Sequence, residues 1–339
     1  MDTPSSKAAR PWLKVLTDTV LVLKALLIKA DNLWQNVRFV TPLYLLIPVC
    51  MLYDICCIGH ITLDKVVTPR AEKHMAGGTA FYFSNAIRNM DVKYKLVTAV
   101  ADTELPSVSK LTDKGIEVKA LPSRHSVYFE NIYGDNQDNR TQRVLQKADP
   151  FTVTDLQDTE AVIFHLGALL ADDISTGLIK ALFERGNVSV DAQGYLREVV
   201  NQQVHAIDWA DKRDALQYVD ILKVNEHELE VLTGMADIKE GAKILAEWGV
   251  KEVVVTLGSM GSVILNDNVF YTIPAYKPTE VVDATGCGDT YMAGYLYKRV
   301  KGADIQQAGE FAAAMAGLKI ETSGPFEGTE EDVLAMMKR

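Results

Sequence analysis

One run of small residues decides how this chain folds: Asp283-Ala284-Thr285-Gly286-Cys287-Gly288-Asp289. The strand-like segment Glu280-Val281-Val282 precedes it, and an apolar-periodic helix follows it. Glycines let the backbone approach a ligand closely, and the N-terminus of a helix attracts anions. Asp289 adds a carboxylate in the first turn of that helix. The run therefore predicts a strand-to-helix turn that binds a negatively charged group.

The same run predicts the chemistry of phosphoryl transfer. The N–H groups of Gly286, Cys287 and Gly288 are expected to form a nest for the charge that develops on a phosphoryl group. Asp289 is the expected general base, because this reaction asks the protein mainly to position and deprotonate an acceptor hydroxyl. The helix dipole is expected to keep Asp289 ionised. The alternative is a structural turn in which Asp289 is an ordinary first-turn residue.

Residues 283–294 resemble the C-terminal signature of the PfkB/ribokinase family of carbohydrate kinases. That signature reads Asp-Thr-Thr-Gly-Ala-Gly-Asp before a helix of small residues, and Cys287 stands here in place of the usual Ala. Further matches follow in the family's order across residues 54–335. The resemblance implies an α/β, ribokinase-like fold: a doubly wound, mostly parallel sheet with helices on both faces and a small β lid.

The resemblance also implies a reaction and its cofactors. A kinase of this kind phosphorylates a hydroxyl group with ATP and Mg²⁺, so Asp289 is the implied base and residues 286–288 are the implied anion hole. Cys287 is small and contributes only its N–H, which keeps that anion hole intact. A monovalent cation, K⁺, is implied beside Asp283 and Gly324.

Five residues mark the implied substrate site. Asp64 stands where the family binds sugar hydroxyls, although Asp also suits an exposed turn. Gly77 and Gly78 stand where backbone approaches a polyol. Tyr82 replaces the usual Asn, which weakens the prediction that the substrate is ribose or a fructose phosphate. Alternatively, aromatic residues at this position belong to the hydrophobic core. Asp191 ends a strand, where open α/β sheets place ligands, or alternatively it begins a loop. Its run, Asp-Ala-Gln-Gly-Tyr-Leu-Arg, is similar to that of inositol- and nucleoside-kinase-like branches.

Two further segments imply a nucleotide site and a magnesium site. Asn225 and Glu228 resemble the family's Asn-x-x-Glu element, in which Glu228 holds hydrated Mg²⁺ through water. Alternatively, they are the N-cap and the acidic first turn of an ordinary helix. A later strand that ends in a Gly loop resembles the family's nucleotide-proximal loop, and alternatively it is a plain β-hairpin. The implied nucleotide-binding residues are Asn225, Thr256, Gly258, Ser259 and Gly261.

The composition limits the class of protein. With 339 residues, of which 48% are hydrophobic, the chain can bury one large α/β core. A net charge of -10 and the lack of a basic run argue against a nucleic-acid partner. Four Cys give no disulfide framework and favour a cytoplasmic location. The apolar segments at 13–28 and 39–52 contain charges or prolines, so a membrane partner is not expected.

One folded domain is expected. Residues 1–52 are predicted to be an N-terminal extension outside the fold, or alternatively a signal or membrane-surface segment. Residues 53–339 are predicted to form the kinase-like domain. Strand and helix periods alternate along this domain, which predicts the parallel sheet. Lid strands are expected around residues 65–76 and 117–147. Their exposed edges can pair two chains into a homodimer.

These residues together predict an ATP-dependent kinase that phosphorylates a small sugar or polyol. An inositol kinase or a nucleoside kinase, adenosine- or cytidine-like, is the alternative within the same family. A non-catalytic sensor of a polyol or nucleotide on the same scaffold is an alternative of another class, because a fold alone does not fix an activity.

Overall fold

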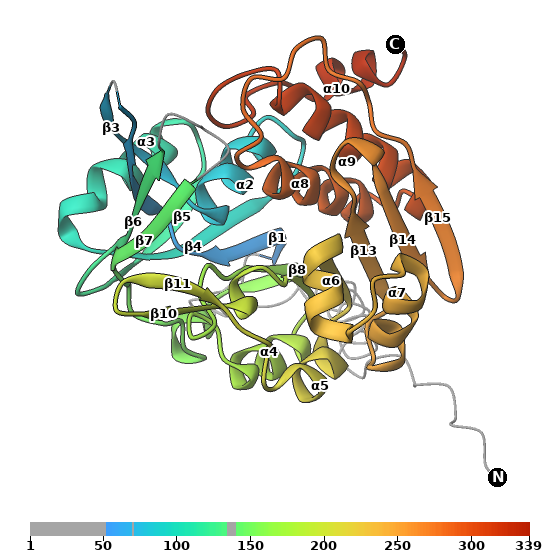
Figure 1. Ribbon diagram of the computed structural model, residues 1–339, viewed down its shortest axis with the longest axis horizontal. Coiled ribbons are helices and arrows are strands. Elements are labelled where there is room, and N and C mark those ends of the chain that lie inside the picture. Colours follow the sequence, from blue (N-terminus) through green and yellow to red (C-terminus); the bar gives the residue numbers. More distant parts are fainter. Residues whose placement is uncertain (1–51, 70, 134–139) are drawn as a thin grey trace, which may run out of the picture. The chain divides into compact units, whose positions relative to one another are not determined.

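The computed structural model describes residues 52–339, apart from residue 70 and residues 134–139 (Figure 1). The expected N-terminal extension and the middle of the expected second lid segment lie outside the described residues, except that Leu52 opens the first strand. Within the described residues, no helix combines the length and the apolar character that crossing a membrane requires.

A nine-stranded sheet lies at the centre of the described domain, in the order β15-β14-β13-β12-β9-β8-β1-β4-β5. Neighbouring strands from β13 to β5 are parallel, whereas β14 and β15 join one edge antiparallel. The expected mostly parallel sheet is therefore confirmed. The strands are β1 (Leu52–Gly59), β4 (Tyr94–Val100), β5 (Glu117–Pro122), β8 (Glu160–Gly167), β9 (Asn187–Asp191), β12 (Ile221–Asn225), β13 (Glu252–Thr256), β14 (Ser262–Asn266) and β15 (Val269–Ile273).

Helices cover both faces of this sheet (Figure 1). Successive side chains of a strand point to opposite faces, so Ile55 and Cys57 of β1 pack into one core while Cys56 and Ile58 pack into the other. The face of Ile55 is covered by α2 (Thr79–Ile87), α3 (Leu105–Asp113), α8 (Cys287–Val300), α9 (Ile305–Lys319) and α10 (Glu330–Met336). The face of Cys56 is covered by α4 (Thr176–Phe183), α5 (Lys212–Ala215), α6 (Glu226–Thr233) and α7 (Ile238–Glu247). Short 3₁₀ turns are η1 (Asp102–Glu104), η2 (Thr154–Leu156), η3 (Gly194–Leu196), η4 (Leu216–Tyr218) and η5 (Gly258–Met260).

A second, six-stranded sheet has the order β10-β11-β7-β6-β2-β3. Strand β2 pairs with β6 in parallel, and the other neighbours are antiparallel. This sheet contains the polar hairpins in which the lid is expected. Its strands are β2 (Thr62–Val67), β3 (Glu72–Gly77), β6 (Val127–Tyr133), β7 (Arg140–Gln146), β10 (Arg197–Val200) and β11 (Gln203–Ala206).

The expected lid segment at 117–147 is wrong at its start. Residues 117–122 form β5, which pairs in parallel with β4 and is the edge strand of the main sheet. The second sheet also contains the β10–β11 hairpin, which lies outside both expected lid segments. Its strands are only four residues long, and its turn requires positive φ angles of 50° at Asn201 and 66° at Gln202. Segments this short carry too little alternation to mark a strand.

The strand expected at residues 280–282 is also wrong. This segment belongs to no sheet, and Val281 is 69% exposed. Its backbone binds the end of α9 instead, because the N–H groups of Val282 and Asp283 both donate to the carbonyl of Ile320, at 2.8 and 3.2 Å. The turn that begins at Asp283 is therefore attached to a helix end rather than to a sheet edge.

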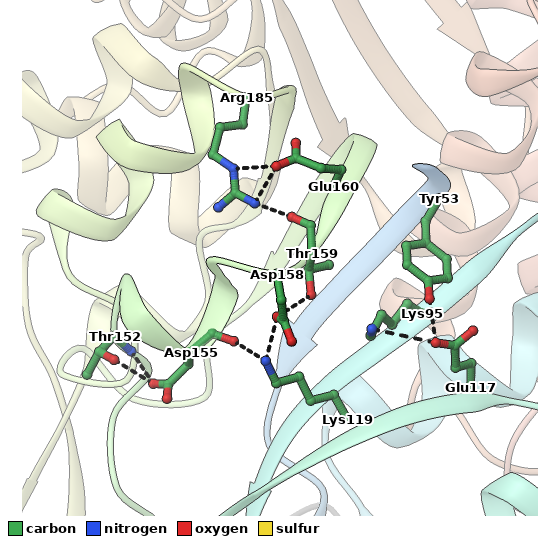
Figure 2. A network of polar contacts seen from close by, with 10 residues as sticks. All are labelled: Tyr53, Lys95, Glu117, Lys119, Thr152, Asp155, Asp158, Thr159, Glu160 and Arg185. Atoms are coloured by element: carbon green, nitrogen blue, oxygen red, sulfur yellow. Dashed lines mark hydrogen bonds and ion pairs between the residues drawn. The ribbon is translucent and has the colours of Figure 1, made fainter. Parts of the chain in front are cut away.

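A polar network ties the amino ends of the parallel strands (Figure 2). The Lys119 ammonium of β5 lies 2.6 Å from a carboxylate oxygen of Asp158, just before β8, and Arg185 pairs with Glu160 of β8 at 2.9 Å. Partly exposed pairs of this kind contribute little individually. These side chains bind one another at the amino ends of the strands. The carboxyl ends, on the opposite side of the sheet, therefore remain for a ligand.

We expect Gly261→Ala to destabilise the domain. Gly261 has a φ of 91°, and a Cβ atom there would lie 2.1 Å from the carbonyl oxygen of Ile273. A positive φ costs a non-glycine residue about 1–3 kcal/mol in the free energy of unfolding, which urea denaturation measures, and the clash adds to that cost at Gly261. Gly302→Ala is the matched control, because Gly302 also has a positive φ, 84°, but its Cβ would meet nothing within 4 Å. Equal losses in the two variants would contradict the packing role given to Gly261.

Candidate active site

A cavity of about 710 Å³ lies at the carboxyl ends of the parallel strands. The last residues of three neighbouring strands line it: Asp191 of β9, Asn225 of β12 and Thr256 of β13. The beginnings of α2 and α8 contribute Thr79 and Asp289, and the second sheet supplies further lining residues. The chain order reverses between β1 and β8, and open α/β sheets bind ligands beside such a reversal. The fold thus brings polar side chains from distant parts of the chain together at the carboxyl ends of the strands.

Asp289 lies in the first turn of α8, partly exposed to the cavity. Burial in its surroundings raises the pKa of this carboxyl to about 6, and the charge of Asp191 adds to the increase. Lys223 and a hydrogen bond with Thr79 act in the opposite direction. Burial therefore raises this pKa although Asp289 lies at a helix start. A carboxyl with a pKa near 6 is ionised in most molecules at neutral pH and is well matched to accept a proton.

Lys223 is a buried ammonium group among three carboxylates, and sequence reasoning missed it. Its Nζ atom lies 3.1 Å from Oδ2 of Asp191 and 4.0 Å from Oε2 of Glu228. A Cβ atom on Gly288 would come within 3.3 Å of the same Nζ atom. Burial lowers the pKa of Lys223, but Asp191 and Glu228 outweigh that effect and raise it. Lys223 is therefore charged, directly beneath the start of α8.

The turn before α8 brings part of the expected anion hole to the cavity. Gly286 has a φ of 76° and packs against the ring of Tyr82, since a Cβ there would lie 2.2 Å from a ring carbon. Gly286 and Gly288 line the cavity, whereas Cys287 does not. The N–H of Cys287 donates to the carbonyl of Ala284 at 3.2 Å, and its thiol points toward α9. Burial raises the pKa of that thiol to about 11, which makes it a poor nucleophile.

The expected substrate residues lie around this cavity. Asp64, Gly78, Tyr82 and Asp191 line it, and Asp64 accepts a hydrogen bond from the Thr62 hydroxyl at 2.7 Å. Gly77 is not part of the lining. A Cβ atom on Gly77 would lie 2.4 Å from Oδ2 of Asp64, so this glycine leaves room for the carboxylate. Two adjacent aromatic residues of α2 differ in their surroundings: Tyr82 lines the cavity, and Phe83 stacks on His165 inside the core.

Among the expected nucleotide-binding residues, Asn225, Thr256 and Gly258 line the cavity. Ser259 and Gly261 belong to the same loop but lie outside the lining, and Gly261 is required by the packing of the β14–β15 hairpin. A nucleotide role for these two residues stays a prediction.

Glu228 and Asn225 form a capping box at the start of α6. The Asn225 side chain accepts from the Glu228 N–H, and Glu228 Oε2 accepts from the Asn225 N–H, each at 2.8 Å. The alternative reading of these residues as a helix cap is thus realised in the structure. Burial raises the pKa of Glu228, against the opposing charge of Lys223. Glu228 does not line the cavity; it lines a smaller pocket that shares Asn225 and His227 with it. Mg²⁺ binds few protein carboxylates and keeps several waters, so the capping box does not exclude an ion held by Glu228 through water.

The residues expected to hold K⁺ do not fit that ion. Asp283 lies beside Gly324, whose N–H is 3.4 Å from Asp283 Oδ2. The ammonium of Lys319 occupies the same place, 2.7 Å from the Asp283 carbonyl oxygen.

Several cavity residues were missed because the tertiary fold alone brings them there. Asn131 and Gln142 come from neighbouring strands of the second sheet and bind each other at 3.0 Å. Lys223 did carry a signal, since a lysine inside the apolar strand Ile221–Asn225 is unusual for a buried strand. The other missed lining residues include Thr79, Gln193, Arg197 and His227.

We expect Asp289→Asn to stabilise the folded domain at pH 7. The carboxyl has a pKa of about 6 in the fold against an ordinary value of 3.8, so ionisation opposes folding. Wild-type stability is therefore lost as pH rises from about 4 through 6, by up to about 3 kcal/mol. Urea denaturation should give Asp289→Asn a higher free energy of unfolding at pH 7 and no advantage at pH 4. The control is Asp304→Asn, which changes an exposed helix cap; an equal gain there would contradict the burial argument.

We expect Lys223→Met to move the acid limb of the pH–rate profile to higher pH. Lys223 lowers the pKa of Asp289, so its loss leaves the base protonated over a wider range. The value of kcat/KM at pH 6 should fall roughly tenfold or more, and raising the pH should restore part of it. A loss that is equal at every pH would show that Lys223 does not act through the proton affinity of Asp289.

Comparison with known proteins gives a consistent group of relatives. The profile of the pfkB family carbohydrate kinases matches residues 55–332. A nucleoside kinase of Methanothermobacter thermautotrophicus is 36% identical over 287 residues, which cover 80% of this chain and 90% of that protein. A cytidine kinase of Thermococcus kodakarensis is 28% identical over 270 residues, which cover 75% of this chain and 91% of that protein.

A solved structure agrees in fold. A pyrophosphate-dependent kinase in the ribokinase family, complexed with a pyrophosphate analogue and myo-inositol, superposes with a TM-score of 0.75 at 31% identity. The match covers 83% of this chain and 99% of that one. The ribokinase-like fold class expected from the sequence is thereby confirmed.

Proposed function

Because the chain belongs to the pfkB family of carbohydrate kinases, we propose that it phosphorylates a hydroxyl group of a cyclitol or a nucleoside. The observation that carries the proposal is the position of Asp289, a carboxyl of raised pKa in the first turn of α8 on the cavity. A kinase with a hydroxyl acceptor needs a base there and an anion-binding helix start beside it.

Each step of the transfer has a residue to perform it. Asp64 and Asp191 accept hydrogen bonds from the acceptor and orient it. Asp289 accepts the proton of one hydroxyl as its oxygen forms a bond to phosphorus, while the bond from phosphorus to the leaving oxygen of the donor breaks. The N–H groups at Gly286 and Gly288, with the ammonium of Lys223 behind them, stabilise the charge on the transferred group.

The donor is proposed to be ATP with Mg²⁺. Asn225, Thr256 and Gly258 border the cavity on the side of β12 and β13 and are proposed to contact the donor phosphates. Glu228 would hold Mg²⁺ largely through water, and the ion would neutralise phosphate charge. Pyrophosphate is the second candidate donor, because a relative at 31% identity depends on it.

The acceptor is proposed to be rich in hydroxyl groups. The second sheet turns carboxylate, hydroxyl and amide side chains toward the cavity, which supports a ligand with several hydrogen-bonding groups. Tyr82 and Phe129 add aromatic surface, which suits one face of a cyclitol ring or of a nucleoside base. A small sugar or another polyol is the wider candidate class, because all of these acceptors carry alcohol hydroxyl groups.

Two further proposals concern the state of the protein in the cell. Strands β3 and β10 are the edges of the second sheet, so two chains are proposed to pair through them as a homodimer. Cys56, Cys57 and Cys287 are free thiols, which favours a reducing, cytoplasmic location.

We expect one acceptor to be phosphorylated when the full-length protein is incubated with each compound of a panel. The panel contains myo-inositol, cytidine, adenosine, ribose, fructose and fructose phosphate, each with Mg²⁺ and either ATP or pyrophosphate. Release of ADP or phosphate should depend on one acceptor class and one donor. Binding of an acceptor without turnover under every condition would instead support a non-catalytic sensor.

We expect Asp289→Asn to keep its fold and its donor affinity but to lose kcat by about 10²-fold or more. Steady-state kinetics with the acceptor from the panel measures the loss. Asp304→Asn is the matched control, since Asp304 also stands at a helix start but lies away from the cavity. Near-normal turnover by Asp289→Asn would reject Asp289 as the base.

A further inference from the structure

Lys319, the last residue of α9, is a charged side chain with no exposed surface. Its ammonium donates to the carbonyl oxygens of Asp283 at 2.7 Å and Thr322 at 3.4 Å, and it lies 3.5 Å from Oδ2 of Asp283. An ammonium group has three N–H donors, and three oxygens surround this one. Burying a cation is costly unless it is paired and hydrogen-bonded, so this position is a built site for a positive charge.

The carbonyl that binds Lys319 begins the turn that leads to the anion hole. Asp283 Oδ1 accepts the N–H of Thr285 at 2.9 Å, and the cavity lining runs from Asp283 to Gly286. Burial raises the pKa of Asp283, but its hydrogen bond from Thr285 and the charge of Lys319 outweigh burial and hold the pKa below its ordinary value. Two charged groups therefore hold the turn: the carboxylate of Asp283, which binds the Thr285 N–H, and the ammonium of Lys319, which binds the Asp283 carbonyl.

We propose that the ammonium of Lys319 is the resident cation of the phosphoryl-transfer site, which fixes the turn at residues 283–286 and makes activity independent of K⁺ and other monovalent cations. This inference rests on the proposed function. It replaces the K⁺ ion expected beside Asp283 and Gly324. A K⁺ ion needs a set of oxygen atoms in place of its hydration shell, and here an ammonium already uses the Asp283 carbonyl.

Lys319 acts as a positioning residue. It does not line the cavity, so it touches no reacting atom. Its effect passes through the backbone of Asp283 to Gly286 and the start of α8. Its charge reaches the same region, because Lys319 opposes the increase in the pKa of Cys287, the first residue of α8. Loss of this charge should loosen the turn and misplace the anion hole relative to Asp289.

The wild-type protein provides the first test. Initial rates and melting temperature are measured in KCl, NaCl and choline chloride at one ionic strength. We expect kcat to change less than about twofold among the three salts, and no rise in melting temperature that is specific to K⁺. Stimulation of several fold by K⁺, or a melting temperature raised by K⁺ alone, would overturn the proposal.

The variant Lys319→Ala provides the second test. We expect kcat to fall by about 10²-fold, because a small displacement of catalytic groups has effects of that size, with a smaller change in KM. K⁺, NH₄⁺ or ethylamine should restore part of the rate, and K⁺ should raise the melting temperature of this variant. The control is Lys298→Ala, whose ammonium pairs with Glu330 away from the cavity and which should show no cation response.

Two results with Lys319→Ala would reject the proposal: a wild-type kcat, or a folded protein whose lost activity no cation restores. If the variant does not fold, the wild-type salt comparison decides. If the wild type phosphorylates nothing in the panel, the proposed function fails while the melting measurements on the two proteins still report whether Lys319 occupies a cation site.

Discussion

The charge balance around Lys223 is the interaction on which the candidate site depends. The strand ends of β9 and β12 bring Asp191 and Lys223 within 3.1 Å, and the start of α8 lies above them. Without this ammonium, the carboxylates of Asp191, Glu228 and Asp289 would repel one another more strongly, although the charge of Arg197 also acts on Glu228 and Asp289. Burial is the main reason why Asp289 has a raised pKa, and the charge of Asp191 adds more to the increase than Lys223 removes.

Charged side chains are arranged differently at the amino ends and at the carboxyl ends of the main-sheet strands. At the amino ends, the ion pairs of Figure 2 are partly exposed and bind one another. At the carboxyl ends, buried charged groups converge on a cavity, where a low dielectric strengthens their interactions. Lys223 and Lys319 lie behind the turn that leads into α8, one under Gly288 and one under Asp283.

Local pattern predicted the parts of the fold and site that are set locally. The parallel strands are recognisable in the sequence as apolar runs, and Asp289 follows a glycine turn at a helix start. The local sequence pattern did not predict which side chains from different elements lie next to one another in the fold. The lysine of β12 interrupts an apolar strand, but its ion-pair partner Asp191 belongs to β9, and Gly288 of α8 lies beside its ammonium. Residues 280–282 have strand-like side chains, yet no strand edge is available to them, so they bind the end of α9.

The most direct test of the central claim is the titration of the Asp289 carboxyl itself. Carbon-13 NMR of the aspartate carboxyl groups, with the Asp289 signal assigned by its absence in Asp289→Asn, gives this pKa without any assumption about the substrate. A midpoint near pH 6 is the result expected from burial beside Asp191 and Lys223. A midpoint at or below the ordinary value of 3.8 would contradict the charge balance from which the base is assigned.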